Sequence, residues 1–307
     1  SPYLVKRTVQ DNEGTTSWIY LYSKQQIHKS WDEPTVLLDA TMPEEINRVF
    51  YPQLSVEQFQ CPMCHTTITQ ILDKTLSKAM MLPGETATKR KQAERERNIE
   101  RLISLLKVLI NRIKCSVIIE GVSIKLLLIT SKALESVLAQ VGLPEGVSTL
   151  HFGATSGLDL FKQVPCLVIA SRLEVPLEIA EHQASVLKGE MVESVLEDGS
   201  VWYDKRLIGI ETQDNVIGVS ATRHPVPLVE EIRWSWNEGQ LIQAIGRARA
   251  VRRSAANPLE LFILTNVPLP LVVDHAVNWE DVIPVNVEQV LAEHGIAPLS
   301  RNEMVRV

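Results

Sequence analysis

The sequence predicts an α/β protein built on a mainly parallel β-sheet flanked by helices. Short apolar runs of strand length alternate with helical patterns over residues 117–285. Alternation at this spacing is typical of βαβ units, whose strands are parallel. Hydrophobic residues make up 45% of the 307 residues, which is enough to bury a core.

The strands and helices of this region are expected in a fixed order. Four strands are predicted, at residues 124–130, 147–152, 166–170 and 259–265. Ser131 is placed to cap a helix over Lys132–Val141, which Gly142 would end. A second helix is expected from Pro176 to Leu187. Short alternating runs with turn residues within 192–220 predict a β-hairpin insertion.

The N-terminal region also carries strand patterns. Residues 18–22 are rich in strand-forming side chains. Residues 35–41 form a short apolar run that ends in small polar residues, which is typical of a parallel strand buried on both faces. Pro43 and the acids after it favour a helix start. A polar strand tip before a helix is a common ligand site in open α/β sheets.

A long amphipathic helix is predicted over residues 89–114. Seven apolar residues recur there at helical spacing: Ile99, Leu102, Ile103, Leu106, Leu109, Ile110 and Ile113. The charged first part of this helix could contact nucleic acid, but its mixed signs favour a solvated face. With strands predicted at 56–59 and 67–71, the region 61–116 is interpreted as a linker. Cys61, Cys64 and His65 have haem-attachment spacing, yet no further ligands are placed to hold a metal, so none is expected.

Composition restricts the classes of function. The chain has 31 basic and 37 acidic residues and a net charge of −6, which argues mildly against a protein that coats DNA. No membrane span or signal peptide is visible, and four cysteines do not form a disulfide framework. The expected location is therefore the cytoplasm, without membrane partners.

The stretch 240–253 has the most distinctive pattern in the chain. Its apolar residues recur at roughly helical spacing, and the other face carries four polar side chains: Gln243, Arg247, Arg249 and Arg252. Arginine has a fixed charge and a planar fork of donors that suits phosphate. Gly246 allows close approach to the backbone. An isolated basic helix would otherwise be interpreted as solvated surface.

A second candidate phosphate site is the loop at residues 152–161. Its small residues, among them Thr155 and Gly157, can expose backbone N–H groups to a phosphate. Asp159 adds an acceptor for a ribose hydroxyl or for an arginine.

These motifs together resemble those of superfamily 2 helicases. Gln243, Gly246, Arg247 and Arg249 resemble motif VI, which supplies arginine fingers to ATP on a neighbouring domain. Three further motifs match in family order: Asp39-Ala40-Thr41 resembles motif III with aspartate in place of serine, Ser131 and Lys132 lie where motif IV is expected, and Gly157 with Asp159 resembles motif V. The chain looks most like the helicase region of plasmid and phage-type primase–helicase proteins.

The resemblance implies a RecA-like fold and a role for each motif. Arg247, Arg249 and Arg252 become candidate catalytic fingers, because the family's second arginine falls where this chain has Ala250. The ATP-binding set is Gln243, Gly246, Gly157 and Asp159. Asp39, Ala40 and Thr41 would couple ATP to nucleic acid, which Ser131, Lys132 and Thr155 would contact.

Two motifs of the family are missing: the phosphate-binding P-loop and the Walker B acids. The resemblance therefore implies the C-terminal part of a longer DNA helicase, in which ATP and Mg²⁺ are held mainly by an N-terminal RecA-like domain, with a primase domain as a further partner. Four regions are predicted: the end of that domain at 1–60, the linker at 61–116, the second RecA-like domain at 117–285 and a helical extension at 286–307. This chain alone is not expected to hydrolyse ATP.

The expected partner is single-stranded or unwinding duplex DNA. The alternative that stays open is an ATPase-inactive RecA-like module that binds nucleic acid or a protein partner. An unrelated α/β enzyme is not supported, because neither a Gly-x-Gly-x-x-Gly sequence nor a nucleophile elbow is present.

Overall fold

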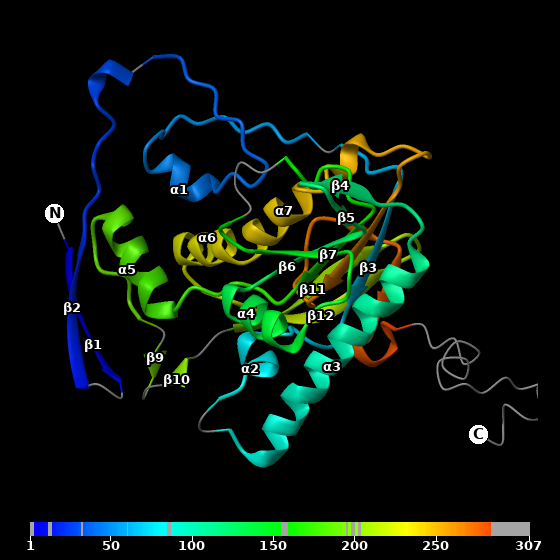
Figure 1. Cartoon of the computed structure of the whole chain (residues 1–307). Helices are drawn as coiled ribbons and strands as arrows, with labels where there is room; N and C mark the ends of the chain where they lie inside the picture. Colours follow the sequence, from blue (N-terminus) through cyan, green and yellow to red (C-terminus); the bar gives the residue numbers. More distant parts are fainter. Residues whose placement is uncertain are drawn as a thin grey trace, which may run out of the picture.

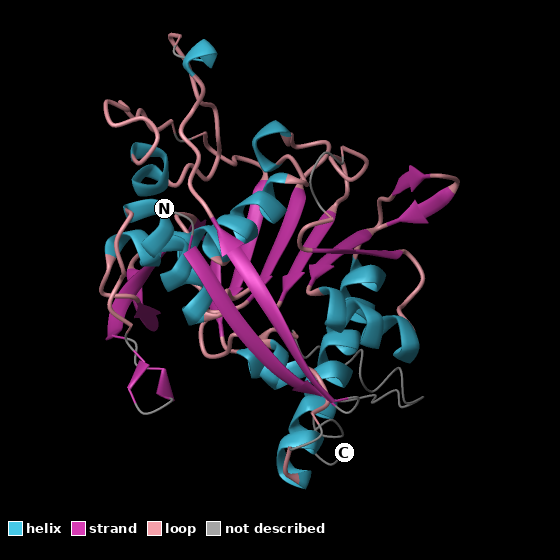
Figure 2. Ribbon diagram, turned by 90° about the vertical axis from the view of Figure 1, so that its left-hand side faces the viewer, coloured by secondary structure: helices cyan, strands magenta, loops and turns pink. Residues whose placement is uncertain are grey.

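A six-stranded parallel sheet forms the centre of the computed structural model. The model describes residues 3–11, 14–31, 33–59, 61–84, 87–154, 159–194, 196–197, 200–201 and 204–283. In spatial order the strands are β15 (His275–Val277), β3 (Thr66–Ile71), β13 (Leu259–Leu264), β8 (Cys166–Ala170), β6 (Leu126–Thr130) and β7 (Val147–His151). Every neighbouring pair is parallel. Figure 1 and Figure 2 show helices on both sides of this sheet.

The four predicted strands are confirmed as members of this one sheet. β6 and β8 are buried at all five of their positions, as expected for central strands covered on both faces. The run 124–130 is divided, because β5 (Val122–Ile124) pairs with β4 (Val117–Ile119) in a separate hairpin before β6 begins. The fold class is therefore α/β with a parallel sheet.

One face of the sheet is covered by α3 (Lys89–Arg112), α4 (Lys132–Val141) and the short α2 (Lys78–Met81). The buried side of α3 packs against the side chains of β6, β8 and β13 that point to this face. Trp279, in a 3-10 turn at Trp279–Asp281, is fully buried and donates from Nε1 to Asn98 Oδ1 at 3.0 Å. The predicted amphipathic helix and the capped helix after Ser131 are confirmed.

The interpretation of 61–116 as a linker differs from the structure. β3 lies inside the main sheet, between β13 and β15, and α3 contributes to the same core. The pattern of β3 (Thr-Thr-Ile-Thr-Gln-Ile) resembles a half-exposed strand, and its partners follow about two hundred residues later, so local sequence could not place it. Residues 56–59, predicted as a strand, have no regular structure.

The other face of the sheet is covered by α7 (Glu238–Gly246) and by the hairpin of β11 (Asp204–Thr212) and β12 (Val216–Arg223). Leu241, Ala244 and Ile245 of α7 pack with the side chains of β6, β8 and β13 that point to this face. The short β14 (Val272–Val273) pairs with β11. A hairpin was expected around residues 197–199, and β9 (Leu196–Glu197) and β10 (Ser200–Val201) do pair there, but the longer hairpin is β11–β12.

A smaller apolar cluster joins three helices beside the sheet: α1 (Glu44–Arg48), α5 (Leu177–Lys188) and α6 (Pro227–Trp236). The helices predicted after Pro43 and Pro176 are thus present. A two-stranded ribbon of β1 (Tyr3–Asp11) and β2 (Gly14–Tyr22) lies next to α5, where the Tyr22 and His182 rings are 6.4 Å apart (Figure 1). A 3-10 turn at Lys29–Trp31 and the turn at Ala250–Arg252 complete the described elements.

The predicted buried strand at 35–41 is wrong. These residues have no strand structure, and the side chains of Val36 and Leu38 are 81% and 92% exposed. A strand buried on both faces needs a strand on each side and helices above and below it. The described part of the chain places no strand beside 35–41, and Thr41 at the end of the run is buried by contact with α7. The helical extension predicted at 286–307 lies outside the described residues.

Candidate functional site

The segment around Thr41 meets helix α7. Asp39 Oδ1 accepts hydrogen bonds from the Thr41 backbone N–H at 2.8 Å and from Thr41 Oγ1 at 3.1 Å, which closes a tight turn. Gln243 Nε2 then donates to Thr41 Oγ1 at 3.0 Å. Gly239, one turn earlier in α7, lies against Thr41, and a Cβ at this glycine would sit 3.8 Å from the threonine Cβ. Two motifs 202 residues apart are therefore in direct contact.

Arg249 pairs with Asp159. The guanidinium donates from Nη2 at 2.5 Å and from Nε at 3.2 Å to the same carboxylate oxygen, Oδ1. The hydrogen bond and charge of Arg249 lower the pKa of Asp159, and Lys162 and Arg252 add to this effect. Both side chains of the pair are partly exposed. The predicted motif V aspartate and a motif VI arginine are thus in contact.

The helix expected over 240–253 ends early. α7 stops at Gly246, and Arg249 has a φ of +50°, which lies in the left-handed region and cannot continue a right-handed helix. A 3-10 turn, Ala250–Arg252, follows. The prediction of one continuous helix is therefore wrong, and residues 247–253, termed the arginine loop, hold the arginines on a bent backbone. The predicted helical repeat of apolar residues does not hold at Val251, whose side chain is 53% exposed.

Arg253 anchors the arginine loop. Its side chain is buried, and it donates to the carbonyl oxygens of Ala248 and Val164, the latter at 2.8 Å. Burial lowers the pKa of this guanidinium from its ordinary value. Because Val164 lies two residues before β8, this anchor fixes the loop near the amino end of that strand.

The other arginines of the loop are more accessible. Arg247 is half-buried, and its Nε has no hydrogen-bond partner among the described residues. Arg252 is exposed. A Cβ added to Gly246 would meet no atom within 4 Å, so packing does not require glycine there and the surface above it is open. Arg252 is therefore the arginine of this loop that is most open to an anion from outside, whereas the unpaired Nε of Arg247 is buried.

The predicted nucleic-acid residues lie elsewhere. Ser131 is 1% exposed, and its Oγ accepts from the Leu134 backbone N–H at 3.3 Å, so its hydroxyl caps α4 and is not on the surface. Lys132, the first residue of α4, is exposed. Both follow β6 at the carboxyl edge of the sheet, whereas Arg253 ties the arginine loop to the amino edge. Thr155 and Gly157 lie outside the described residues, and Ala40 is exposed.

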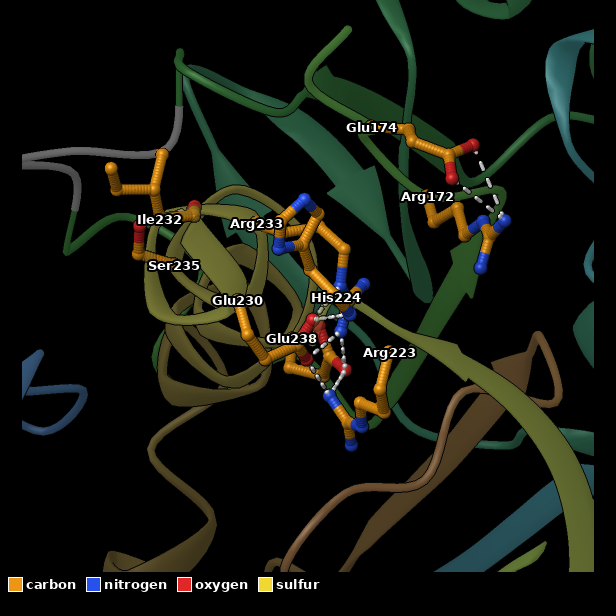
Figure 3. Close-up of polar contacts among 9 residues, drawn as sticks. All are labelled: Arg172, Glu174, Arg223, His224, Glu230, Ile232, Arg233, Ser235 and Glu238. Atoms are coloured by element: carbon orange, nitrogen blue, oxygen red, sulfur yellow. Dashed lines mark hydrogen bonds and ion pairs between the residues drawn. The ribbon is translucent and has the colours of Figure 1, made fainter. Parts of the chain in front are cut away.

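Sequence reasoning missed a buried network of charges (Figure 3). Arg223 Nη1 lies 2.7 Å from carboxylate oxygens of both Glu230 and Glu238. Arg233 Nη2 lies 2.7 Å from Glu230 and 2.8 Å from Glu238. Two positive and two negative charges thus balance, and they join the end of β12 to α6 and to the start of α7. No local signal could reveal the network, since its four members come from three elements and look like ordinary surface charges.

The network also shifts the ionisation of its members. Burial raises the pKa of Glu230, but the hydrogen bonds and charge of Arg233, with bonds from His224 and Arg223, lower it more, so the net shift is downward. Burial lowers the pKa of Arg233, but Glu230 and Glu238 raise it more, so the net shift is upward. Glu230 and Arg233 therefore stay charged in the folded protein at neutral pH, and the network fixes the position from which α7 starts.

The chemistry of these clusters suits anion binding. The arginine loop offers guanidinium donors. Gln243 of α7, four residues before Arg247, forms a neutral polar pair with Thr41. Within the described ranges, no group of three or more His, Cys, Asp or Glu residues is placed to hold a metal ion. Within the same ranges, no helix has both the length and the apolar character needed to cross a membrane.

The fold and these clusters define an α/β protein with a helix-flanked parallel sheet and an arginine-bearing loop on one face. Comparisons with family models, with curated proteins and with solved structures found no match.

Proposed function

We propose that this chain supplies the arginine side of an ATP site in a superfamily 2-type DNA helicase or translocase with RecA-like domains. The observation that carries the proposal is the hydrogen bond from Gln243 to Thr41. Each of these residues belongs to a segment whose sequence resembles a helicase motif. If the two resemblances were accidental, there would be no physical reason for these two distant segments to be in contact.

The arginine loop fits the terminal phosphate of a nucleotide. Arg252 is exposed, and Arg247 follows the open surface at Gly246 and is half-buried, with a buried Nε that has no partner among the described residues. Arg249 would have to exchange or share its bond with Asp159. Arginines that reach the γ-phosphate stabilise the charge that develops in the transition state of phosphoryl transfer.

The remaining parts of the ATP site are assigned to a separate P-loop domain. The described residues of this chain fit a phosphate better than they fit Mg²⁺, because their cationic donors gather in the arginine loop and no acidic cluster accompanies them. In the proposed assembly, the bond between Gln243 and the Asp39–Thr41 turn carries the nucleotide state toward the nucleic-acid surface at Lys132.

A second candidate is a RecA-like module without ATPase chemistry that binds nucleic acid or a partner. The pairing of Arg249 with Asp159 favours it, because that arginine is already satisfied within the chain. The two candidates differ in one measurable property, the effect of the arginines on ATP turnover.

The test uses the longer protein that the resemblance implies. Arg247, Arg249 and Arg252 are replaced singly by Ala and by Lys, and DNA-stimulated turnover and nucleotide affinity are measured. Loss of a true finger should lower turnover by roughly 10³-fold with little change in affinity, and Lys should not rescue it, since lysine lacks the planar fork. Near-normal turnover in all six variants would remove the proposal.

Arg48→Ala is the matched control. Arg48 and Arg249 have the same side-chain exposure of 38%, and each pairs with one carboxylate, Glu44 in the case of Arg48. Arg48 lies on α1, away from the arginine loop. Its loss should leave turnover unchanged, which separates the effect of a finger from the effect of removing any exposed ion pair.

A further inference from the structure

The first part of α3 extends beyond the rest of the fold. The buried residues of this helix begin at Asn98, which bonds Trp279 just past the carboxyl edge of the sheet. Residues 89–97 precede it, and nine residues of helix span about 13 Å. Figure 1 shows this end of α3 as the lowest part of the described fold, with α2 between it and α4.

This projecting part is basic in an acidic protein. Residues 89–97 contain five basic residues and two acidic ones, a net charge of +3, whereas the whole chain has −6. The first turn carries Lys89, Arg90 and Lys91 and no acid. Cations are unfavourable at a helix N-terminus, because they face the positive end of the helix dipole. By contrast, α4, α5, α6 and α7 all have an acidic residue in the first turn.

Four of the five cations of this segment are also unpaired among the described residues. Lys89, Arg90, Lys91 and Arg97 are exposed, and none of them takes part in a salt bridge between described residues. Glu96 instead accepts a hydrogen bond from Gln92 at 3.2 Å. Arginine and lysine side chains held out to solvent without internal partners are available to an external polyanion.

A line of further lysines connects this segment to the carboxyl edge of the sheet. α2 packs against both α3 and α4. Its first residue, Lys78, is exposed, and so is Lys132 at the start of α4. Arg95 holds α2 in place by donating from Nε to the Ala79 carbonyl oxygen at 2.8 Å. The helix starts therefore present cations along one side of the molecule.

We propose that the projecting part of α3, together with Lys78 and Lys132, binds the phosphate backbone of single-stranded nucleic acid. The inference rests on the proposed function, whose nucleic-acid surface it extends from Lys132 along α3. Spaced cations that follow a strand are typical of such binding. A lipid surface fits less well, since a membrane-bound helix needs large apolar side chains on one face and residues 89–97 have none.

The test measures binding of labelled oligodeoxythymidylate by fluorescence anisotropy over a series of salt concentrations. Arg90 and Arg97 are seven residues apart and thus on one side of the helix, and both are replaced by alanine, which favours helix. Each lost phosphate contact lowers the slope of log affinity against log salt by about 0.7, so the double variant should lose about 1.4 from the slope. Circular dichroism checks that the fold is kept.

The matched control is Lys107→Ala with Lys114→Ala. Lys107 lies in the last turns of α3 and Lys114 two residues after its end. Both lysines are exposed, and their replacement removes the same charge as the double arginine variant. The control should keep the wild-type slope. Equal slopes for both double variants would overturn the inference, as would weakened binding of phosphatidylserine vesicles with unchanged oligonucleotide binding.

The outcome is separable from that of the proposed ATP role. Wild-type protein that fails to bind the oligonucleotide at low salt would overturn this inference, whatever the arginine-loop variants do to turnover. A lowered slope in the α3 double variant would support the inference even if the arginine-loop variants kept normal turnover. In that result only the proposed ATP role would fail.

Discussion

Replacing Arg233 by methionine should cost more stability than any exposed substitution in this chain. The side chain is 6% exposed and makes three short contacts with two carboxylates, from Nε to Glu230 at 2.8 Å and from Nη2 to Glu230 and Glu238 at 2.7 and 2.8 Å. Methionine keeps most of the volume but removes one of the two positive charges. Glu230 and Glu238 would then share Arg223 alone.

The magnitude follows from the burial of the partners. Glu238 is 3% exposed, so water cannot replace the lost arginine. Removing one partner of a buried ion pair typically costs about 3–5 kcal/mol, a large share of the roughly 5–15 kcal/mol that stabilises a domain. Arg48→Met, which breaks a half-exposed pair with Glu44, should cost about 1 kcal/mol or less.

The assay is urea unfolding followed by tryptophan fluorescence, with the free energy of unfolding extrapolated to zero denaturant. A second variant makes the reasoning refutable. Arg233→Met combined with Glu238→Leu leaves one arginine and one glutamate, so charge balance returns and the double variant should be more stable than Arg233→Met alone. If the two substitutions instead add their separate costs, charge compensation is not what the network contributes.

Three further predictions concern the same structure. Glu230 has a lowered folded-state pKa, so its contribution to stability is present above its ordinary pKa of 4.5 and is lost as pH falls through the folded value; Glu230→Gln should flatten the acid side of a stability-against-pH curve measured by urea unfolding. Thr41→Val and Gln243→Ala should show a coupling free energy of about 1 kcal/mol in a double-mutant cycle, and a coupling near zero would contradict the contact between the two motifs. Asp159→Asn should release Arg249 and tighten the binding of tripolyphosphate, measured by calorimetry, by at most about fivefold, since exposed ion pairs contribute little; weaker binding would contradict the pairing.

The parallel sheet could be predicted because its central strands are apolar at nearly every position. β6 and β8 are buried throughout, and runs of this kind between capped helices have few other structural solutions. Ser131, Gly142 and Gly189 set helix ends by local chemistry, which local sequence reveals. The same reasoning misassigned 35–41, because an apolar run predicts burial only where other elements exist to cover it.

The sequence predicted the candidate site only as a set of separate motifs, without the contacts between them. The contacts of Thr41 with Gln243 and of Asp159 with Arg249 depend on where the tertiary fold places α7 and the segment before β8. The bend at Arg249 could not be predicted from the sequence, because an arginine gives no indication of a positive φ. The network around Arg233 could not be predicted for a different reason. Ion pairs between residues of three separate elements produce no periodic pattern in the sequence.

The position of β3 has a consequence for how the chain folds as it is synthesised. Its neighbours are β13 and β15, so Thr66 pairs with Leu259 and Ile71 with Val277. Contacts this distant in sequence are slow to form, because a long loop must close first. At about 5–20 residues per second, β3 waits roughly ten to forty seconds on the ribosome for a partner. During that interval its backbone and the apolar side chains of Ile68 and Ile71 are open to mispairing, and a chaperone that shields this short segment would raise the yield of folded protein.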